Sequence, residues 1–157
     1  MAKIKKFQKK DTEAVARLVF DTFKRFNSGD YFDKRGVQKY LDMYDTKKNR
    51  VEDIYQSFKR SPIFYVAVKE DKIVGMVRGR PDKLINLYVD ERFQGQGIAR
   101  KLVEKFETEA KKRGGEEIKI RSSVYAMPFY EKMGYKKTTG IRNLKGVKVY
   151  PMKKRLR

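Results

Sequence analysis

The turn from Gln94 to Ala99 is the part of the sequence best suited to binding an anion. It lies between a strand-forming run that ends at Val89 and an amphipathic helical pattern that begins at Ile98. The first amides of a helix have no partners within the helix, and the helix dipole adds partial positive charge there. Glycines at such a turn let a phosphate approach the backbone closely. The turn therefore predicts a pyrophosphate site, with ordinary helix capping as the alternative.

Two common nucleotide-binding loops do not fit these residues. A P-loop ends in Gly-Lys-Ser/Thr, whereas Gly97 is followed by Ile98 and Ala99. A dinucleotide-binding fingerprint needs a third small residue three positions after its second glycine, and that position holds Arg100. A cation at this place instead favours an additional contact with the same anion.

The residue types that are missing restrict the possible chemistry. The chain has no Cys and no His, which excludes disulfide bonds, a thiolate nucleophile and a Ser-His-Asp triad. The usual ligands of zinc and most other transition metals are also missing, so we expect no metal site. Catalysis would have to use Asp, Glu, Tyr, Lys, Ser or backbone groups.

The chain is strongly basic. Its 157 residues include 40 Lys and Arg against 20 Asp and Glu, a formal net charge of +20, which attracts anionic ligands or partners. Basic clusters at both ends leave open a nucleic-acid contact through Lys3, Lys5, Lys6, Lys9, Lys10, Lys153, Lys154, Arg155 and Arg157. No apolar run is long enough for a signal peptide or a membrane span, so we expect a cytoplasmic protein without a membrane partner.

Hydrophobic periodicity predicts a single domain over residues 1–157. A short strand and three helical patterns come first, and two strands joined by a turn and a further strand lead to the glycine turn. A helix, a strand, a short helix and two terminal strands follow the turn. The predicted strands cover residues 3–8, 63–68, 73–77, 84–89 and 116–121, with two more flanking residues 143–146. This order is typical of a mixed α/β (α+β) domain.

A second motif follows the glycine turn, one helix and one strand later. It covers residues 126–135, with the sequence AMPFYEKMGY. Together with Leu87-Tyr88-Val89 and the Gln-x-x-Gly-x-Ala pattern of residues 94–99, this motif resembles the signatures of the GNAT superfamily of acetyl-CoA-dependent N-acetyltransferases. The motifs lie within residues 63–135, and the predicted element order extends the resemblance to the whole chain.

The resemblance implies a fold and a cofactor site. The fold would be a mostly antiparallel sheet of six to seven strands with four to five flanking helices. Its strands 84–89 and 116–121 would splay into a V that holds acetyl-CoA. Backbone groups of Leu87, Tyr88 and Val89 would pair with the pantetheine arm, near Ser123, which stands where many relatives have Asn. The pyrophosphate would be held by Gln94, Gly95, Gln96, Gly97, Ile98, Ala99 and Arg100.

The resemblance also implies catalytic and acceptor residues. Tyr130 matches the tyrosine that protonates, or hydrogen-bonds to, the departing CoA thiolate, a role that suits a phenol with a pKa of about 10. Lys83 stands in the region where some relatives have a glutamate base, which makes the adjacent Asp82 the candidate base. Ordered water and backbone carbonyls are the alternative route for the proton. Tyr31 and Phe32 are the candidates for the lip of the acceptor pocket.

The predicted reaction is direct transfer of the acetyl group to a primary amine of a small molecule, peptide or protein, through a ternary complex. The positive charge suits an anionic or peptidic acceptor. Two alternatives stay open, namely a nucleic-acid or ribosome-associated module of the same fold without catalysis, and a transferase for another acyl-CoA. Nucleic acid is less favoured because no RNA-binding motif is recognisable. The sequence is compatible with a monomer or a homodimer.

Overall fold

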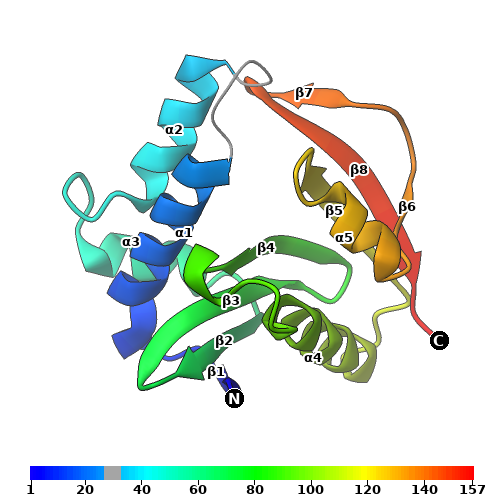
Figure 1. The fold of residues 1–157 in the computed structure, drawn as a ribbon, viewed down its shortest axis with the longest axis horizontal. Coiled ribbons are helices and arrows are strands. Elements are labelled where there is room, and N and C mark those ends of the chain that lie inside the picture. Colours follow the sequence, from blue (N-terminus) through cyan, green and yellow to red (C-terminus); the bar gives the residue numbers. More distant parts are fainter. Residues whose placement is uncertain (27–32) are drawn as a thin grey trace.

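The computed structural model describes residues 1–26 and 33–157, and in this part of the chain eight strands form one sheet with five α-helices around it (Figure 1). The helices are α1 (Thr12–Phe26), α2 (Lys34–Tyr44), α3 (Val51–Phe58), α4 (Ile98–Lys112) and α5 (Met127–Lys132). The strands are β1 (Lys3–Lys6), β2 (Ile63–Lys69), β3 (Lys72–Arg80), β4 (Lys83–Val89), β5 (Glu117–Ser123), β6 (Lys136–Lys137), β7 (Arg142–Leu144) and β8 (Val147–Arg155). Short 3-10 turns occupy Lys9–Asp11 and Glu91–Phe93.

The sheet runs in the order β1-β2-β3-β4-β5-β8-β6, with β7 paired to β8. Neighbouring strands are antiparallel except for β4 and β5. Parallel neighbours need a crossover connection, and α4 supplies it here. The predicted mixed, mostly antiparallel α/β fold is confirmed. The strand that the sequence analysis did not predict is β6, because two residues are too short to show any periodicity.

Helices cover the sheet on two faces because alternate residues of a strand point in opposite directions. In β2, Tyr65 and Ala67 belong to a buried cluster with α4, whereas Phe64 and Val66 belong to a second cluster with α1 and α3. The α4 cluster also holds Tyr130 of α5. Burial of each large apolar side chain in these layers contributes about 1.5–3 kcal/mol.

The ends of α1 and α4 show how local chemistry sets the helix boundaries. Gly114 follows α4 with a left-handed φ of +85°, and the amide of Gly115 donates to the Ala110 carbonyl at 2.8 Å, which forms a glycine cap. The start of α1 is set by a 3-10 turn and not by a side-chain N-cap from Asp11. The carboxylate of Asp11 accepts from the amide of Gln8 at 2.9 Å in a 3-10 turn, so α1 begins at Thr12 after that turn.

Candidate functional site

A β-bulge interrupts β4 in the middle of the sheet. In its pairing with β3, Asn86 lies opposite Arg78. The next pair along the strands joins Leu84 to Gly79, which leaves Ile85 as an extra residue. A bulge bends its strand and increases the local twist. The second half of β4 is therefore turned away from the direction of the first half.

The pairing between β4 and β5 stops at this bulge. The parallel pairs are Lys83 with Lys119 and Leu84 with Ile120, and no pair is found beyond them in the described residues. Residues 87–89 pair only with β3 on their other side. Backbone groups on the β5 side of this segment are thus left for other partners, and the splay of the two strands has a local physical cause.

The turn after β4 exposes its backbone. Asp90 accepts from the amide of Arg92 at 2.9 Å and starts the 3-10 turn. Gly95 and Gly97 have φ values of +76° and +79°, a conformation that favours glycine. A Cβ added at either glycine would meet nothing within 4 Å. The space beside the turn is therefore open.

The amides of residues 95–100 have no hydrogen-bond acceptor among the described residues. Gly97 precedes α4 without a side-chain cap. The amide of Lys101 is the first to bond back into the turn, at 3.1 Å from the Gly97 carbonyl. Unpaired amides at a helix start, together with the positive end of the helix dipole, favour an anion.

A cleft of about 630 Å³ opens beside these amides. The predicted cofactor residues that line it are Leu87, Tyr88, Val89, Gln94, Gly95, Gly97, Ile98, Ala99, Arg100 and Ser123. Gln96 is not part of the lining, and its side-chain oxygen accepts from Lys69 Nζ at 2.6 Å. Ser123 Oγ accepts from the amide of Ala126 at 3.1 Å, so this oxygen also supports the turn before α5.

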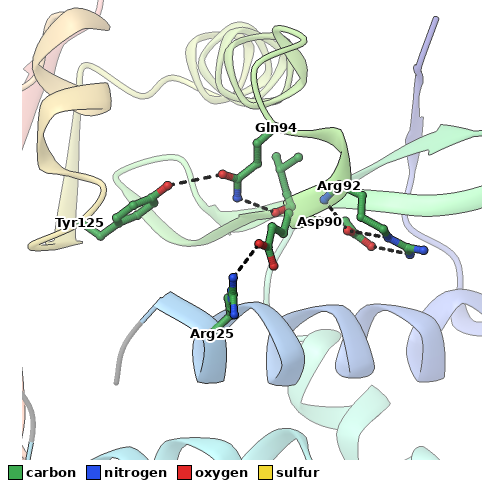
Figure 2. Close-up of polar contacts among 7 residues, drawn as sticks. Arg25, Asp90, Arg92, Gln94 and Tyr125 are labelled. Carbon is green, nitrogen blue, oxygen red and sulfur yellow. Dashed lines mark hydrogen bonds and ion pairs between the residues drawn. The ribbon is translucent and has the colours of Figure 1, made fainter. Parts of the chain in front are cut away.

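Gln94 bridges two walls of the cleft, as Figure 2 shows. Its Nε2 donates to the Val89 carbonyl at 3.1 Å, and its Oε1 accepts a long hydrogen bond of 3.4 Å from the Tyr125 hydroxyl. Arg25 of α1 forms an ion pair with Glu91, in the turn after β4, at 3.0 Å. These contacts connect the end of α1, the turn after β4 and the loop before α5.

The sequence analysis missed several residues of the cleft wall. Phe26 and Tyr125 stack with their ring centroids 4.6 Å apart. Tyr125 directly precedes the second motif, and this position was a signal from which it could have been predicted. Phe26 lies on α1, and nothing in the sequence connects it to Tyr125. The lining residues that were not predicted are Thr22, Phe26, Phe93, Tyr125, Ala126, Phe129, Lys132 and Met133.

Tyr130 is buried at 5% exposure in the core beside the cleft. Its ring makes edge contacts with Phe129 at 5.3 Å and Tyr135 at 5.6 Å. Burial, followed by the nearby Tyr88, raises the pKa of the Tyr130 phenol above its usual value. Its hydroxyl has no hydrogen-bond partner among the described residues. A buried polar group without a partner calls for an explanation, and a ligand supplies one.

A series of buried polar side chains ends at Tyr88 on the cleft wall. The hydroxyl oxygens of Tyr88 and Tyr40 are 2.7 Å apart. Asn86 donates its Nδ2 to the Tyr40 hydroxyl at 2.9 Å and accepts at Oδ1 from Arg78 Nε at 2.6 Å. Arg78 also donates to the Tyr44 hydroxyl at 3.0 Å. The sequence analysis did not predict this network, because its members come from α2, β3 and β4.

Arg78 sets the direction of the donors in this network. It is 7% exposed, has no carboxylate partner in the part of the chain that is described, and lies 5.0 Å from the Phe58 ring. Because a guanidinium can only donate, Asn86 must turn its oxygen to Arg78 and its amide to Tyr40. Burial is the main cause that raises the pKa values of Tyr40 and Tyr88, so both phenols stay neutral.

The remaining predicted residues do not join the cleft. Asp82 lies in the turn between β3 and β4, with its side chain 75% exposed and 3.5 Å from Arg80. Extended chain separates it from Leu87 by roughly 16 Å. Its role as the base stays a prediction that its position does not support. Tyr31 and Phe32 lie outside the described residues.

In residues 1–26 and 33–157, no group of three or more acidic side chains is arranged to hold a metal ion. None of the described helices combines the length and the apolar character needed to cross a bilayer.

Comparison with known sequences gives a consistent family assignment. The acetyltransferase (GNAT) domain family matches residues 32–156. Human N-acetyltransferase 8 is 33% identical over 120 residues, which cover 67% of this chain and 52% of that protein. Human N-acetyltransferase 8B is 31% identical over a segment of the same length. The chain thus spans about half the length of the curated relatives it matches.

Solved structures show the same fold. The PaiA N-acetyltransferase from Thermoplasma acidophilum, solved in complex with coenzyme A, has a TM-score of 0.76 at 20% identity, over 99% of both chains. A GCN5-related N-acetyltransferase from Rhodopseudomonas palustris has a TM-score of 0.82 at 17% identity, over 99% of this chain and 96% of that one. At these identities the likeness concerns the fold.

Proposed function

Since this chain belongs to the GNAT family of acetyltransferases, we propose that it transfers the acetyl group of acetyl-CoA directly to a primary amine. The observation that carries this proposal is the set of unpartnered amides at residues 95–100, all but Gln96 belonging to residues that line an open cleft at the free side of β4. A pyrophosphate would accept from these amides. Arg100 lines the same cleft and adds a cation, although it also lies 3.7 Å from Glu104.

The cleft would hold the rest of acetyl-CoA along β4. Residues 87–89 have a free backbone side towards β5 and would pair with the amide groups of the pantetheine arm, as an added strand does. The Gln94 side chain donates to the Val89 carbonyl in this structure. Binding of acetyl-CoA would replace this hydrogen bond by one from the pantetheine arm. The thioester would then lie between β4 and α5.

In the proposed reaction, the amine nitrogen bonds to the acetyl carbon and the carbon–sulfur bond breaks. A backbone N–H of residues 87–89 would donate to the oxygen that gains negative charge. Tyr130 would give its proton, or a hydrogen bond, to the departing thiolate. Its raised pKa keeps the phenol protonated until that moment, and its unpartnered hydroxyl leaves the proton available.

Tyr88 would contact the acceptor on the other side of β4. Its hydroxyl completes the series of hydrogen bonds that starts at the buried Arg78. A buried cation without a carboxylate favours negative charge or a carbonyl oxygen nearby. This supports an acceptor with an anionic or peptidic group next to its amine. The proton of the amine would pass to ordered water that backbone carbonyls hold by hydrogen bonds, and from there to the solvent, since Asp82 is distant.

A screen of amines and peptides with acetyl-CoA, reporting the free thiol of CoA, tests this proposal. We expect thiol release that depends on one class of amine, together with thermal stabilisation of the protein by CoA. Longer acyl-CoA molecules, assayed in parallel, test the choice of acyl group. Absence of stabilisation by both CoA and acetyl-CoA would overturn the proposal.

A further inference from the structure

A row of basic residues crosses five neighbouring strands of the sheet. The strand register places Lys83 opposite both Arg80 and Lys119. It also places Lys153 opposite both Lys119 and Lys136. Paired residues point to the same face of a sheet, about 4.8 Å apart. These five residues, called the basic row here, span roughly 19 Å across β3, β4, β5, β8 and β6.

The basic row lies on the face that α4 and α5 do not cover. Ile118 and Ile120 of β5 point to the opposite face of the sheet, where they are buried in the α4 cluster. On the face of the row, which α1 and α3 cover over β2 and β3, Lys119 and Arg121 of β5 are exposed, and so is Lys153 of β8. Arg80 and Lys136 are exposed too, at the two ends of the row. A ligand can therefore reach the row along most of its length.

Acidic neighbours balance only part of this charge. Arg80 lies 3.5 Å from Asp82, and Lys153 lies 3.8 Å from Glu117. In residues 1–26 and 33–157 no carboxylate forms an ion pair with Lys83, Lys119, Lys136 or Arg121. Like charges directly opposite one another destabilise a sheet. The nearby Arg121 and Arg80 add to the effect of burial in lowering the pKa of Lys83.

We propose that the basic row binds the sugar–phosphate backbone of duplex nucleic acid. Duplex DNA carries about one negative charge per 1.7 Å of axis when both strands are counted, so about eleven phosphates fall within the length that the row spans, and those on the near side can contact it. On β5 and β8 the neighbouring residues that share its face are Glu117, Arg121, Pro151 and Arg155, and none of them carries an aromatic ring. Single-strand binding relies on aromatic stacking, so this face favours a duplex and sequence-independent contact. The surface is distinct from the acetyl-CoA cleft and does not depend on the proposed enzymatic activity.

Binding of a fluorescent 20-base-pair duplex by the full chain, titrated at several salt concentrations, tests this proposal. The logarithm of the binding constant falls linearly with the logarithm of the salt concentration. In Lys119→Gln/Lys153→Gln, the slope of this line should become shallower by about one unit for each lost phosphate contact, about two in all. The double variant should bind about tenfold more weakly. The matched control is Lys3→Gln/Lys10→Gln, which removes the same charge from two exposed lysines of the N-terminal segment. We expect the control to bind within about twofold of the unsubstituted protein.

Three results would overturn the proposal. The first is an equal loss in the control, which would assign binding to the overall charge or to the N-terminus. The second is tighter binding of single-stranded DNA than of the duplex. The third is preferential binding of poly-glutamate, which would indicate an acidic protein partner. The thermal unfolding midpoint of each variant, measured without ligand, should match that of the unsubstituted protein and shows that the variants are folded.

Discussion

The hydroxyl oxygens of Tyr40 and Tyr88 lie 2.7 Å apart and connect α2 to the wall of the cleft. Tyr40→Phe would leave the Asn86 amide without its acceptor inside the protein. We expect a loss of about 1–3 kcal/mol in the free energy of unfolding, measured in urea. Tyr55→Phe is the control, because no hydrogen bond of the Tyr55 hydroxyl is found among the described residues. Equal stability of the two variants would contradict the network.

Tyr130→Phe tests the proposed acid. We expect kcat to fall about 100-fold or more, with the Kd of CoA and the free energy of unfolding nearly unchanged, because the hydroxyl has no partner in the described structure. Tyr135→Phe is the matched control, since that hydroxyl donates to Glu107 Oε2 at 2.8 Å. It should lose stability and keep its kcat. An unchanged kcat in Tyr130→Phe would reduce Tyr130 to a packing residue.

Gly97→Trp tests the anion site at the start of α4. The indole would extend into the open space beside the unpartnered amides and block the pyrophosphate. Gly114→Trp imposes a similar backbone cost, since Gly114 has a φ of +85° and equally open surroundings at the other end of α4. We expect isothermal titration to show weakened CoA binding in Gly97→Trp alone. Equal loss in both variants would point to backbone strain as the cause.

The stability of the protein should fall at alkaline pH because several tyrosine phenols are buried. Folding raises the pKa values of Tyr40, Tyr88, Tyr130 and Tyr135, with burial as the largest cause. These groups contribute no pH dependence below the unfolded value of about 10. Above it, the unfolded chain releases protons that the folded chain retains, so stability falls as the pH rises. Ultraviolet titration should show these four tyrosines ionising only as the protein unfolds. Ionisation of all ten tyrosines while the protein is still folded would contradict this prediction.

Asp82→Asn should leave catalysis unchanged. Asp82 is exposed in the turn between β3 and β4, and its ion pair with Arg80 is a surface contact of small energetic value. We expect kcat/KM and its pH profile to match those of the unsubstituted protein within about twofold, given this exposure. A change in the acidic limb of the profile would restore Asp82 as the base.

Much of the fold could be predicted from the sequence because its signals are local. A continuous apolar run over residues 63–68 marks β2, and the spacing of Leu102, Phe106 and Ala110 marks α4. The pair Gly114-Gly115 marks where α4 ends. The glycine turn and the motif around Tyr130 lie next to the elements that position them, so both were found from neighbouring residues. The two-residue strand β6 was missed because it forms only through pairing with β8.

The sequence by itself indicated the fold class, the turn whose amides can hold an anion and, through the second motif, Tyr130 as a candidate acid. Only the tertiary structure decided which distant residues share a site. The stacking of Phe26 on Tyr125, the network from Arg78 to Tyr88 and the basic row join segments that lie tens of residues apart. Their proximity depends on the pairing order of the strands and on how the helices pack against the sheet. Both depend on the balance of packing over the whole sheet, which no local run of residues specifies.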